Sequence, residues 1–132
     1  MLLLAGIHIQ KCGGFIDTER NFLAASPDGI CSKSEFLIEF KCPYKATKVE
    51  HLNYIKNSKL NPNHNYYYQV QFQLHVTKIL KCHFVVYSST AYFLHIETIS
   101  YDVNFVNDCL NHVDFYYYNI FCPEYLKYKW QK

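Results

Sequence analysis

The sequence predicts an α/β (α+β) fold in one domain that spans residues 1–132. Three observations lead to this class. With 50% hydrophobic and 18% aromatic residues, a chain of 132 residues can bury one core. Segments with strand-like patterns occur both before and after a segment with helical character, and a second helical pattern follows. No internal repeat or linker divides the chain.

The N-terminal quarter of the chain predicts short strands. Residues 1–7 form an apolar run that is too short for a signal peptide or a membrane span, so we expect a buried strand or the end of a helix. Residues 13–17 and 22–25 are strand-like and flank the polar residues 18–21, which predicts a hairpin.

A turn and a longer strand follow. In Ser-Pro-Asp-Gly at residues 26–29, proline and glycine hold the second and fourth positions, where turns favour them. Residues 36–42 alternate, with Phe36, Ile38 and Phe40 on one face and the charged residues on the other. Pro43 lacks a backbone donor and should end this strand.

The middle of the chain leaves two readings open. Residues 44–65 predict a polar, lysine-rich connection, of which a part can be helical. In residues 66–77 apolar and polar side chains alternate as in a strand, but a helical stripe is also present. Glutamine and leucine favour helices, and the preceding asparagines could cap one.

The last third of the chain predicts a hairpin and a helix. Residues 83–87 and 92–99 are rich in β-branched and aromatic residues and are separated by a short polar segment. Apolar residues between 105 and 120 recur at helical spacing, which predicts an amphipathic helix that Pro123 ends.

Charge and cysteine content give weaker indications. The net charge of +2 does not predict a nucleic-acid partner, but five lysines gather between residues 41 and 59 with Glu50 as the only acid. A solvated loop explains this stretch equally well. Six cysteines without a Cys-x2-Cys pair argue against structural zinc and for reduced thiols. We therefore expect a soluble intracellular protein, with nucleus and cytoplasm not distinguished and no membrane partner.

One constellation of side chains could perform chemistry. Glu39 and Lys41 leave the same face of their strand with Cα atoms roughly 6.5 Å apart. The turn at Asp28 could bring a second carboxylate beside Glu39, and the backbone carbonyl of Phe40 could add a third oxygen. Mg²⁺ prefers such ligands. Lys41 could orient water or offset charge in the transition state of phosphodiester hydrolysis. Taken alone, however, these residues are more typical of an ordinary turn and an exposed strand than of a catalytic site.

Three segments resemble, in order and spacing, the motifs of the lambda-exonuclease-like (YqaJ-type) viral recombinase family: residues 25–30, 37–44 and 68–77. The resemblance implies a PD-(D/E)XK, restriction-endonuclease-like core, with a central mixed sheet flanked by helices. It implies that Asp28 and Glu39 bind Mg²⁺ or Mn²⁺ and that Lys41 assists the attacking water. The family also carries a helical glutamine that matches Gln71, with Gln69 beside it, so we expect residues 66–77 to be helical.

The resemblance further implies a metal-dependent exonuclease that digests duplex DNA from an end, often 5′ to 3′ in this family, in viral or mobile-element recombination. Expected partners are duplex DNA, a single-strand annealing protein and further copies of the chain in a ring. Lys45, Lys48 and Gln69 are the expected DNA contacts.

The sequence departs from the family pattern at its N-terminus. Related enzymes place a further acidic ligand on an upstream helix, and no carboxylate precedes Asp17. We therefore expect an N-terminally truncated YqaJ-like exonuclease domain that lacks this helix. Two alternatives remain: a non-catalytic DNA-binding or assembly module that retains the nuclease fold, and a restriction-type endonuclease with the same core.

Overall fold

The computed structural model describes residues 3–4, 7–31, 33 and 35–131. The chain divides into two compact units, Met1–Tyr101 and Asp102–Lys132, and each is described by itself. The expectation of one domain over residues 1–132 stays a prediction.

The first unit is built on a four-stranded mixed sheet with strand order β10-β9-β6-β5. Its strands are β5 (Gly29–Cys31), β6 (Phe36–Lys41), β9 (Lys81–Ser88) and β10 (Phe93–Ser100). Strand β6 pairs antiparallel with β5 and parallel with β9, and β9 pairs antiparallel with β10. The expected α+β class with a central mixed sheet is confirmed. The strand predicted over residues 36–42 ends before Pro43, as expected.

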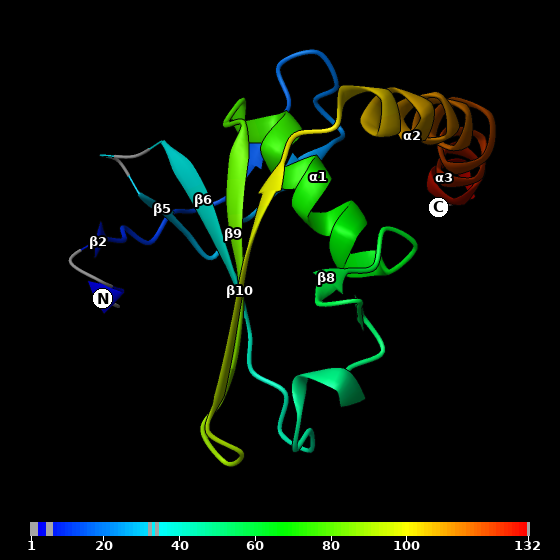
Figure 1. Cartoon of the computed structure of the whole chain (residues 1–132). Coiled ribbons are helices and arrows are strands. Elements are labelled where there is room, and N and C mark those ends of the chain that lie inside the picture. The colour runs from blue at the N-terminus through cyan, green and yellow to red at the C-terminus, as the bar shows by residue number, and fades with distance from the viewer. Residues whose placement is uncertain (1–2, 5–6, 32, 34, 132) are drawn as a thin grey trace. The chain divides into compact units, whose positions relative to one another are not determined.

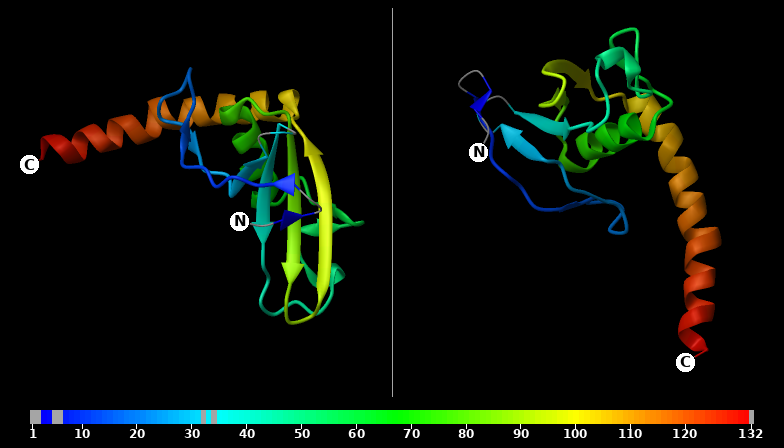
Figure 2. Two further views of the ribbon diagram at one scale, coloured as in Figure 1. Left: turned by 90° about the vertical axis from the view of Figure 1, so that its left-hand side faces the viewer. Right: turned by 90° about the horizontal axis from the view of Figure 1, so that it is seen from below.

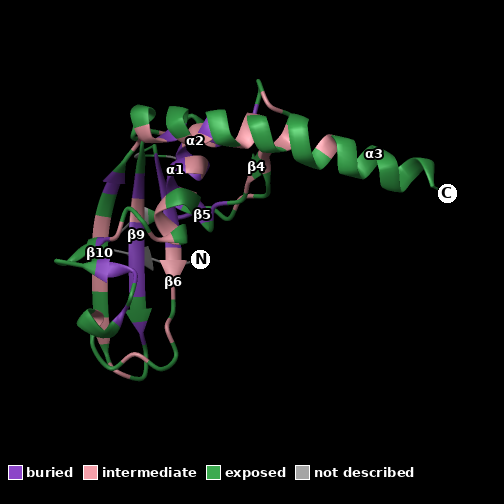
Figure 3. Ribbon diagram, turned by 90° about the vertical axis from the view of Figure 1, so that its right-hand side faces the viewer, coloured by how far each residue is buried: buried purple, intermediate pink, exposed green. Residues whose placement is uncertain are grey.

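Helix α1 (Asn65–Thr77) lies against one face of this sheet, which Figure 1 shows almost edge-on. Leu37, Phe84 and Val86 belong to the buried cluster on the helix side. Phe36 and Ile38 belong to a smaller cluster with Ile9, Cys31 and Val85. The strand alternation in β6 therefore separates two cores, and Figure 3 shows β9 between them as mostly buried.

The helix predicted over residues 66–77 is confirmed, but its cap differs from the prediction. The N-cap is His64, whose Nδ1 accepts a hydrogen bond from the backbone N–H of Tyr66 at 3.1 Å. An imidazole nitrogen here replaces the asparagine oxygen that we expected. The helix ends at Lys78, a residue with φ 61° and ψ 19°, the left-handed conformation common after helix ends.

Short antiparallel pairs and one 3₁₀ turn complete the first unit. The expected hairpin around residues 18–21 is present, but each of its strands has only two residues. The elements are β1 (Leu3–Leu4) with β2 (Ile7–His8), β3 (Phe15–Ile16) with β4 (Ala24–Ala25), η1 (Val49–His51), and β7 (Ile55–Lys56) with β8 (Lys59–Leu60). Part of the apolar run 1–7, namely residues 1–2 and 5–6, lies outside the described residues. Figure 2 shows β9 and β10 as the long neighbouring strands of the sheet.

Gly29 is required by a close approach of two chain segments. A Cβ atom at this position would lie 2.5 Å from Cγ2 of Ile9 and 3.3 Å from the backbone oxygen of Gln10. Gln10 forms an isolated bridge with Ile30, with both backbone hydrogen bonds at 2.9 Å. At the start of β5 there is therefore no room for a larger residue than glycine. Glycine is required here by the lack of space and not by a left-handed backbone conformation.

The second unit is a run of helices: α2 (Val103–Tyr116), the π-helical segment η2 (Tyr117–Phe121) and α3 (Cys122–Trp130). The side chain of Asp102 caps α2 by accepting from the N–H of Phe105 at 3.0 Å. The prediction that Pro123 ends the helix was wrong. Pro123 stands in the first turn of α3, directly after a π segment whose hydrogen bonds run over five residues, so a missing N–H is tolerated there. Among the described residues, no helix has the length and apolar character needed to cross a membrane.

Candidate active site

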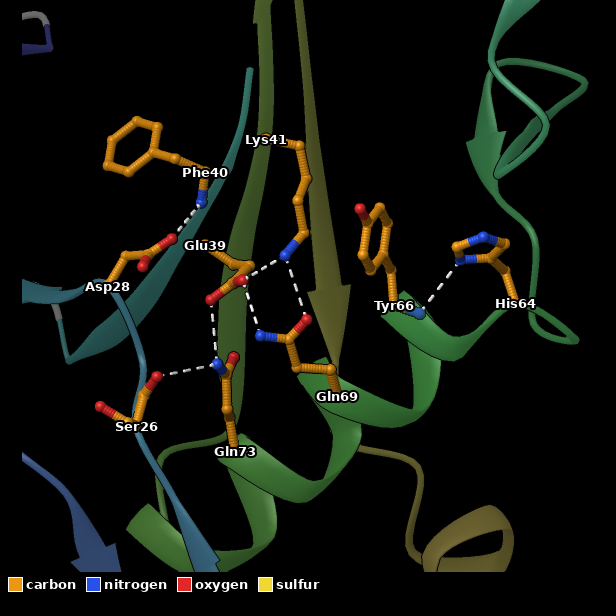
Figure 4. A network of polar contacts seen from close by, with 9 residues as sticks. All are labelled: Ser26, Asp28, Glu39, Phe40, Lys41, His64, Tyr66, Gln69 and Gln73. Carbon is orange, nitrogen blue, oxygen red and sulfur yellow. Dashed lines mark hydrogen bonds and ion pairs between the residues drawn. The ribbon is translucent and has the colours of Figure 1, made fainter. Parts of the chain in front are cut away.

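Asp28 is tied to β6 where the pairing with β5 stops. Strand β5 pairs with β6 only as far as Gly29 opposite Ile38. Beyond that point the Oδ2 atom of Asp28 accepts a hydrogen bond from the backbone N–H of Phe40 at 2.7 Å (Figure 4). In an extended strand the N–H and C=O of one residue point toward the same edge. The Phe40 carbonyl therefore faces the sheet edge at which Asp28 lies.

The carboxylate of Glu39 is buried and held by three donors. Glu39 is only 2% exposed. Oε1 accepts from Nζ of Lys41 at 2.6 Å and from Nε2 of Gln69 at 2.8 Å. Oε2 accepts from Nε2 of Gln73 at 2.9 Å. Burying a carboxylate is costly unless it is paired and hydrogen-bonded, and these donors supply both kinds of compensation.

The ammonium group of Lys41 is fixed from three directions. Besides its ion pair with Glu39, it donates to Oε1 of Gln69 at 3.1 Å. It also lies 4.1 Å from the centroid of the Tyr66 ring, which favours a cation over its face. The amide of Gln69 thus bridges Glu39 and Lys41, because it donates to the carboxylate of Glu39 and accepts from the ammonium group of Lys41 (Figure 4).

Helix α1 turns two of its glutamines toward β6 and a third one away. Gln69 and Gln73 are four residues apart and share a helix face, whereas Gln71 is rotated by roughly 200° from Gln69. Nε2 of Gln71, a fully buried residue, donates to the carbonyl of Ser100 at 2.9 Å. The structure therefore gathers Asp28, Glu39 and Lys41 as predicted, and it directs the Gln71 amide to Ser100.

Sequence reasoning missed two contributors, Gln73 and Tyr66. The useful signal was their spacing on a helix: Tyr66 lies three residues before Gln69, and Gln73 lies four residues after it. Gln69, expected only as a DNA contact, is placed at the centre of the network. Lys45 and Lys48, the other expected DNA contacts, are exposed in the loop that follows β6.

The donor set suits a hard divalent cation. Asp28 and Glu39 offer carboxylate oxygens, and the Phe40 carbonyl faces the edge at which Asp28 lies. Oε1 of Gln73, beside Glu39, is buried without a hydrogen-bond partner, so one more oxygen is available. Mg²⁺ is commonly held by one or two carboxylates together with neutral oxygens and phosphate. Within the described part of the chain, no three His, Cys, Asp or Glu side chains form a metal-binding group, and the nitrogen and sulfur set of a zinc site is not assembled there.

Two of three comparisons with known proteins found similar proteins. A family model described as the YqaJ-like viral recombinase domain matches residues 4–79, more than half of the chain and all of the network above. The structure resembles the crystal structure of an alkaline exonuclease from Laribacter hongkongensis, with a TM-score of 0.75 and 27% identity. It resembles equally the complex of that enzyme with dAMP, with a TM-score of 0.76. These alignments cover 95% of this chain and 63% of the other, so the chain spans less than two thirds of its relative. A search of curated proteins gave no match.

Proposed function

The chain belongs to the YqaJ-like viral recombinase domain family, and on this basis we propose that it is a metal-dependent DNA exonuclease. The proposed reaction is hydrolysis of phosphodiester bonds of duplex DNA from an end. The observation that supports it most is the network in which buried Glu39 contacts Lys41 and α1, one residue away from the backbone group that Asp28 binds. The likeness to a protein described as an alkaline exonuclease supports the same reaction.

The proposed cofactor is Mg²⁺ or Mn²⁺, held by Asp28, Glu39 and the Phe40 carbonyl. When bound, such a cation polarises the phosphate, offsets its charge and makes a coordinated water more acidic. The three protein groups come from the turn before β5 and from two consecutive residues of β6. Loss of any one of them should therefore weaken metal binding without dismantling the sheet.

Lys41 is proposed to position the attacking water and to stabilise negative charge on the phosphate. An ammonium group with three donors can serve Glu39, Gln69 and one further oxygen at the same time. Its fixed position means that little reorganisation is needed when charge develops. We assign the role of the family's helical glutamine to Gln69 and not to Gln71, because Gln69 contacts both Glu39 and Lys41. Gln73 is proposed to fix the second oxygen of Glu39.

The exposed lysines Lys45 and Lys48 are proposed to contact phosphates on the path of the strand beyond the site. Contacts of this kind do not depend on base sequence. Digestion of one strand would leave single-stranded DNA for an annealing protein, which gives the reaction its place in recombination. The direction of digestion, the annealing partner and assembly as a ring stay predictions from the family resemblance.

The proposal is tested with two substrates and one chelator. The chain is incubated with end-labelled linear duplex and with covalently closed plasmid, each with Mg²⁺ and with Mg²⁺ plus excess EDTA. We expect progressive loss of the linear duplex, no loss with EDTA, and an intact plasmid. Cutting of the closed plasmid would favour the endonuclease alternative. Binding of the linear duplex without hydrolysis would favour the non-catalytic module.

A further inference from the structure

A second feature lies just beyond the catalytic strand. A surface pocket of about 260 Å³ is lined by Cys42, Pro43, Tyr44, Tyr87, Ser89 and Thr90. Its first lining residue directly follows Lys41. None of the six side chains is an acid, a lysine, an arginine or a histidine, so the pocket lacks the charged groups that bind a phosphate or a hard metal ion.

The sheet register explains why these residues meet. Lys41 is paired with Val86 in the parallel ladder, so Cys42 and Tyr87 come side by side one residue further on. By strand alternation Tyr87 leaves the sheet on the face opposite to Val86, and therefore opposite to Lys41. The pocket thus lies past the end of β6 and is reached around that end. Three residues of chain span at most about 11 Å, which bounds the distance between the Cα atoms of Lys41 and Tyr44.

The far wall of the pocket is held in place by the β9–β10 turn. Ser88 is 2% exposed, and its Oγ accepts from the N–H of Ala91 at 3.2 Å and lies 3.2 Å from Oγ1 of Thr90. Turn side chains that bond to nearby backbone N–H groups stabilise one loop geometry. The hydroxyl group of Thr90 at this wall is therefore held by Ser88 before any ligand arrives.

The lining chemistry fits a neutral planar ring system. Tyr44 is 83% exposed and Tyr87 is 46% exposed, so two phenol rings are available for stacking. Ser89 and Thr90 add hydroxyl groups that both donate and accept hydrogen bonds. At about 260 Å³ the pocket is smaller than the clefts of roughly 300–1,000 Å³ that take whole drug-sized ligands. A single heterocycle is the ligand class that satisfies size, charge and stacking together.

We propose that this pocket binds a nucleobase of the DNA strand whose phosphate lies at Asp28 and Glu39. The inference rests on the proposed DNA substrate. Successive nucleotides advance about 3.4 Å along duplex DNA, so about three nucleotides cover the same length as the chain from Lys41 to Tyr44. The exposed Lys45 and Lys48 follow the pocket in the chain and supply the positive charge that the pocket lacks.

The test measures DNA binding in Ca²⁺ without Mg²⁺, with hydrolysis monitored in parallel, because a divalent cation is needed to hold a phosphate beside two carboxylates. Binding constants are determined for a natural duplex and for two duplexes with three abasic nucleotides at one end, placed at the 5′ terminus or at the 3′ terminus. Stacking contributes about five- to a hundredfold per base in affinity. We expect one of the two abasic duplexes to bind more weakly than the natural duplex by a factor in this range.

Variants then assign the effect to the pocket. Tyr44→Ala should bind natural and abasic duplexes equally, at the weaker affinity, and Tyr44→Phe should restore the preference because the ring remains. Tyr92→Ala is the matched control. Tyr92 is 88% exposed and lies in the β9–β10 connection near Thr90, but it does not line the pocket. Equal binding of natural and abasic duplexes by the unaltered chain, or equal losses in Tyr44→Ala and Tyr92→Ala, would overturn the base site.

The outcome is separable from that of the nuclease proposal. Hydrolysis of linear duplex in Mg²⁺ without any preference for natural ends overturns the base site and leaves the nuclease standing. A preference for natural ends that depends on Tyr44, in a chain that hydrolyses nothing, supports the base site and contradicts the nuclease.

Discussion

Glu39 shows how one residue connects the fold to the proposed chemistry. It is buried on the helix side of the sheet, yet its two oxygens are occupied by donors from β6 and α1 alone. A carboxylate in this setting cannot relax into solvent, so its position is set by packing. Such preorganisation is the property that a metal ligand requires.

The glutamines of α1 give a direct test of the residue assignments. Gln69→Ala removes the group that bridges Glu39 and Lys41, and we expect hydrolysis of linear duplex to slow by up to about 10²-fold with little change in stability. Gln71→Ala leaves the Ser100 carbonyl without this donor, and we expect the free energy of unfolding to fall by about 1–3 kcal/mol with kcat unchanged. Steady-state kinetics and urea denaturation measure the two quantities. The reverse pattern would return the catalytic role to Gln71.

Two half-buried histidines predict how stability depends on pH. Burial lowers the pKa of His75 below its ordinary value, and Lys78 lowers it further. Burial, with Lys81, also lowers the pKa of His83. A group with a lowered pKa in the folded state binds protons more readily when unfolded, so acid favours unfolding.

We therefore expect the Tm to change little between about pH 7 and 8 and to fall as the pH drops below about 6.5, the ordinary histidine pKa. The fall should level off below the lowered pKa values. His75→Gln should reduce the slope in this window. A thermal denaturation series measures it, and a Tm that rises on acidification through the same window would contradict the assignment.

The sequence could predict that Asp28, Glu39 and Lys41 lie together, whereas their selection as site residues came from the family resemblance. Strand period fixes which side chains share a face, and a turn that leads back beside the strand brings Asp28 to it. The helical glutamine could not be chosen in the same way. In residues 66–77 glutamines recur at every second position, so a motif match that is shifted by two residues selects Gln71, and only the helix phase relative to β6 distinguishes it from Gln69.

At the scale of elements, the short β5 strand is what opens the site. Because β5 begins only at Gly29, opposite Ile38, it does not pair with β6 beyond Ile38. The backbone N–H of Phe40 is therefore left for the Asp28 side chain. The same turn is pressed against Ile9 and Gln10, so its position depends on the absence of a side chain at Gly29. The site geometry and the N-terminal packing are therefore linked through one glycine.

Gly29→Ala should damage both stability and activity. The added methyl must displace Ile9 or the backbone of Gln10, and overpacking of this kind costs about 1–3 kcal/mol. Because Asp28 is the preceding residue, we expect slower hydrolysis even at temperatures where the variant is folded. Gly14→Ala is the matched control, since nothing lies within 4 Å of its new Cβ. Equal stability of the two variants would contradict the close approach.

Element predictions succeeded where the local pattern matched the tertiary environment. The β9–β10 hairpin follows from β-branched and aromatic content. Helix α1 did not follow from periodicity, since one of its glutamines is buried in the core and another faces the site, which gives an alternating pattern on a helix. The helix across Pro123 could not be foreseen either, because the π segment that accommodates the proline has no distinctive sequence pattern.

At the scale of the whole molecule, a net charge of +2 conceals a local asymmetry. Lys45 and Lys48 are exposed in the loop directly after β6, where a strand of DNA leaving the proposed site would pass. Phosphate contacts release counterions, and the dependence of log binding constant on log salt has a slope of about 0.9 per contact. The number of contacts is therefore measurable.

The double variant Lys45→Ala, Lys48→Ala should lower the magnitude of this slope by about 1.8 for duplex DNA. Lys127→Ala is the control, because that lysine is paired with Glu124 at 2.7 Å within the second unit. Fluorescence anisotropy across a salt series gives the slopes. An unchanged slope in the double variant would remove these lysines from the DNA path.

The central claim is that Asp28 and Glu39 form a metal site that hydrolyses DNA, and one comparison tests it most directly. Hydrolysis of end-labelled linear duplex in Mg²⁺ is followed for the unaltered chain and for Asp28→Ala, with DNA binding measured in parallel. We predict metal-dependent digestion that falls to background in Asp28→Ala while the affinity for duplex is largely retained. Digestion by Asp28→Ala at the rate of the unaltered chain would contradict the claim.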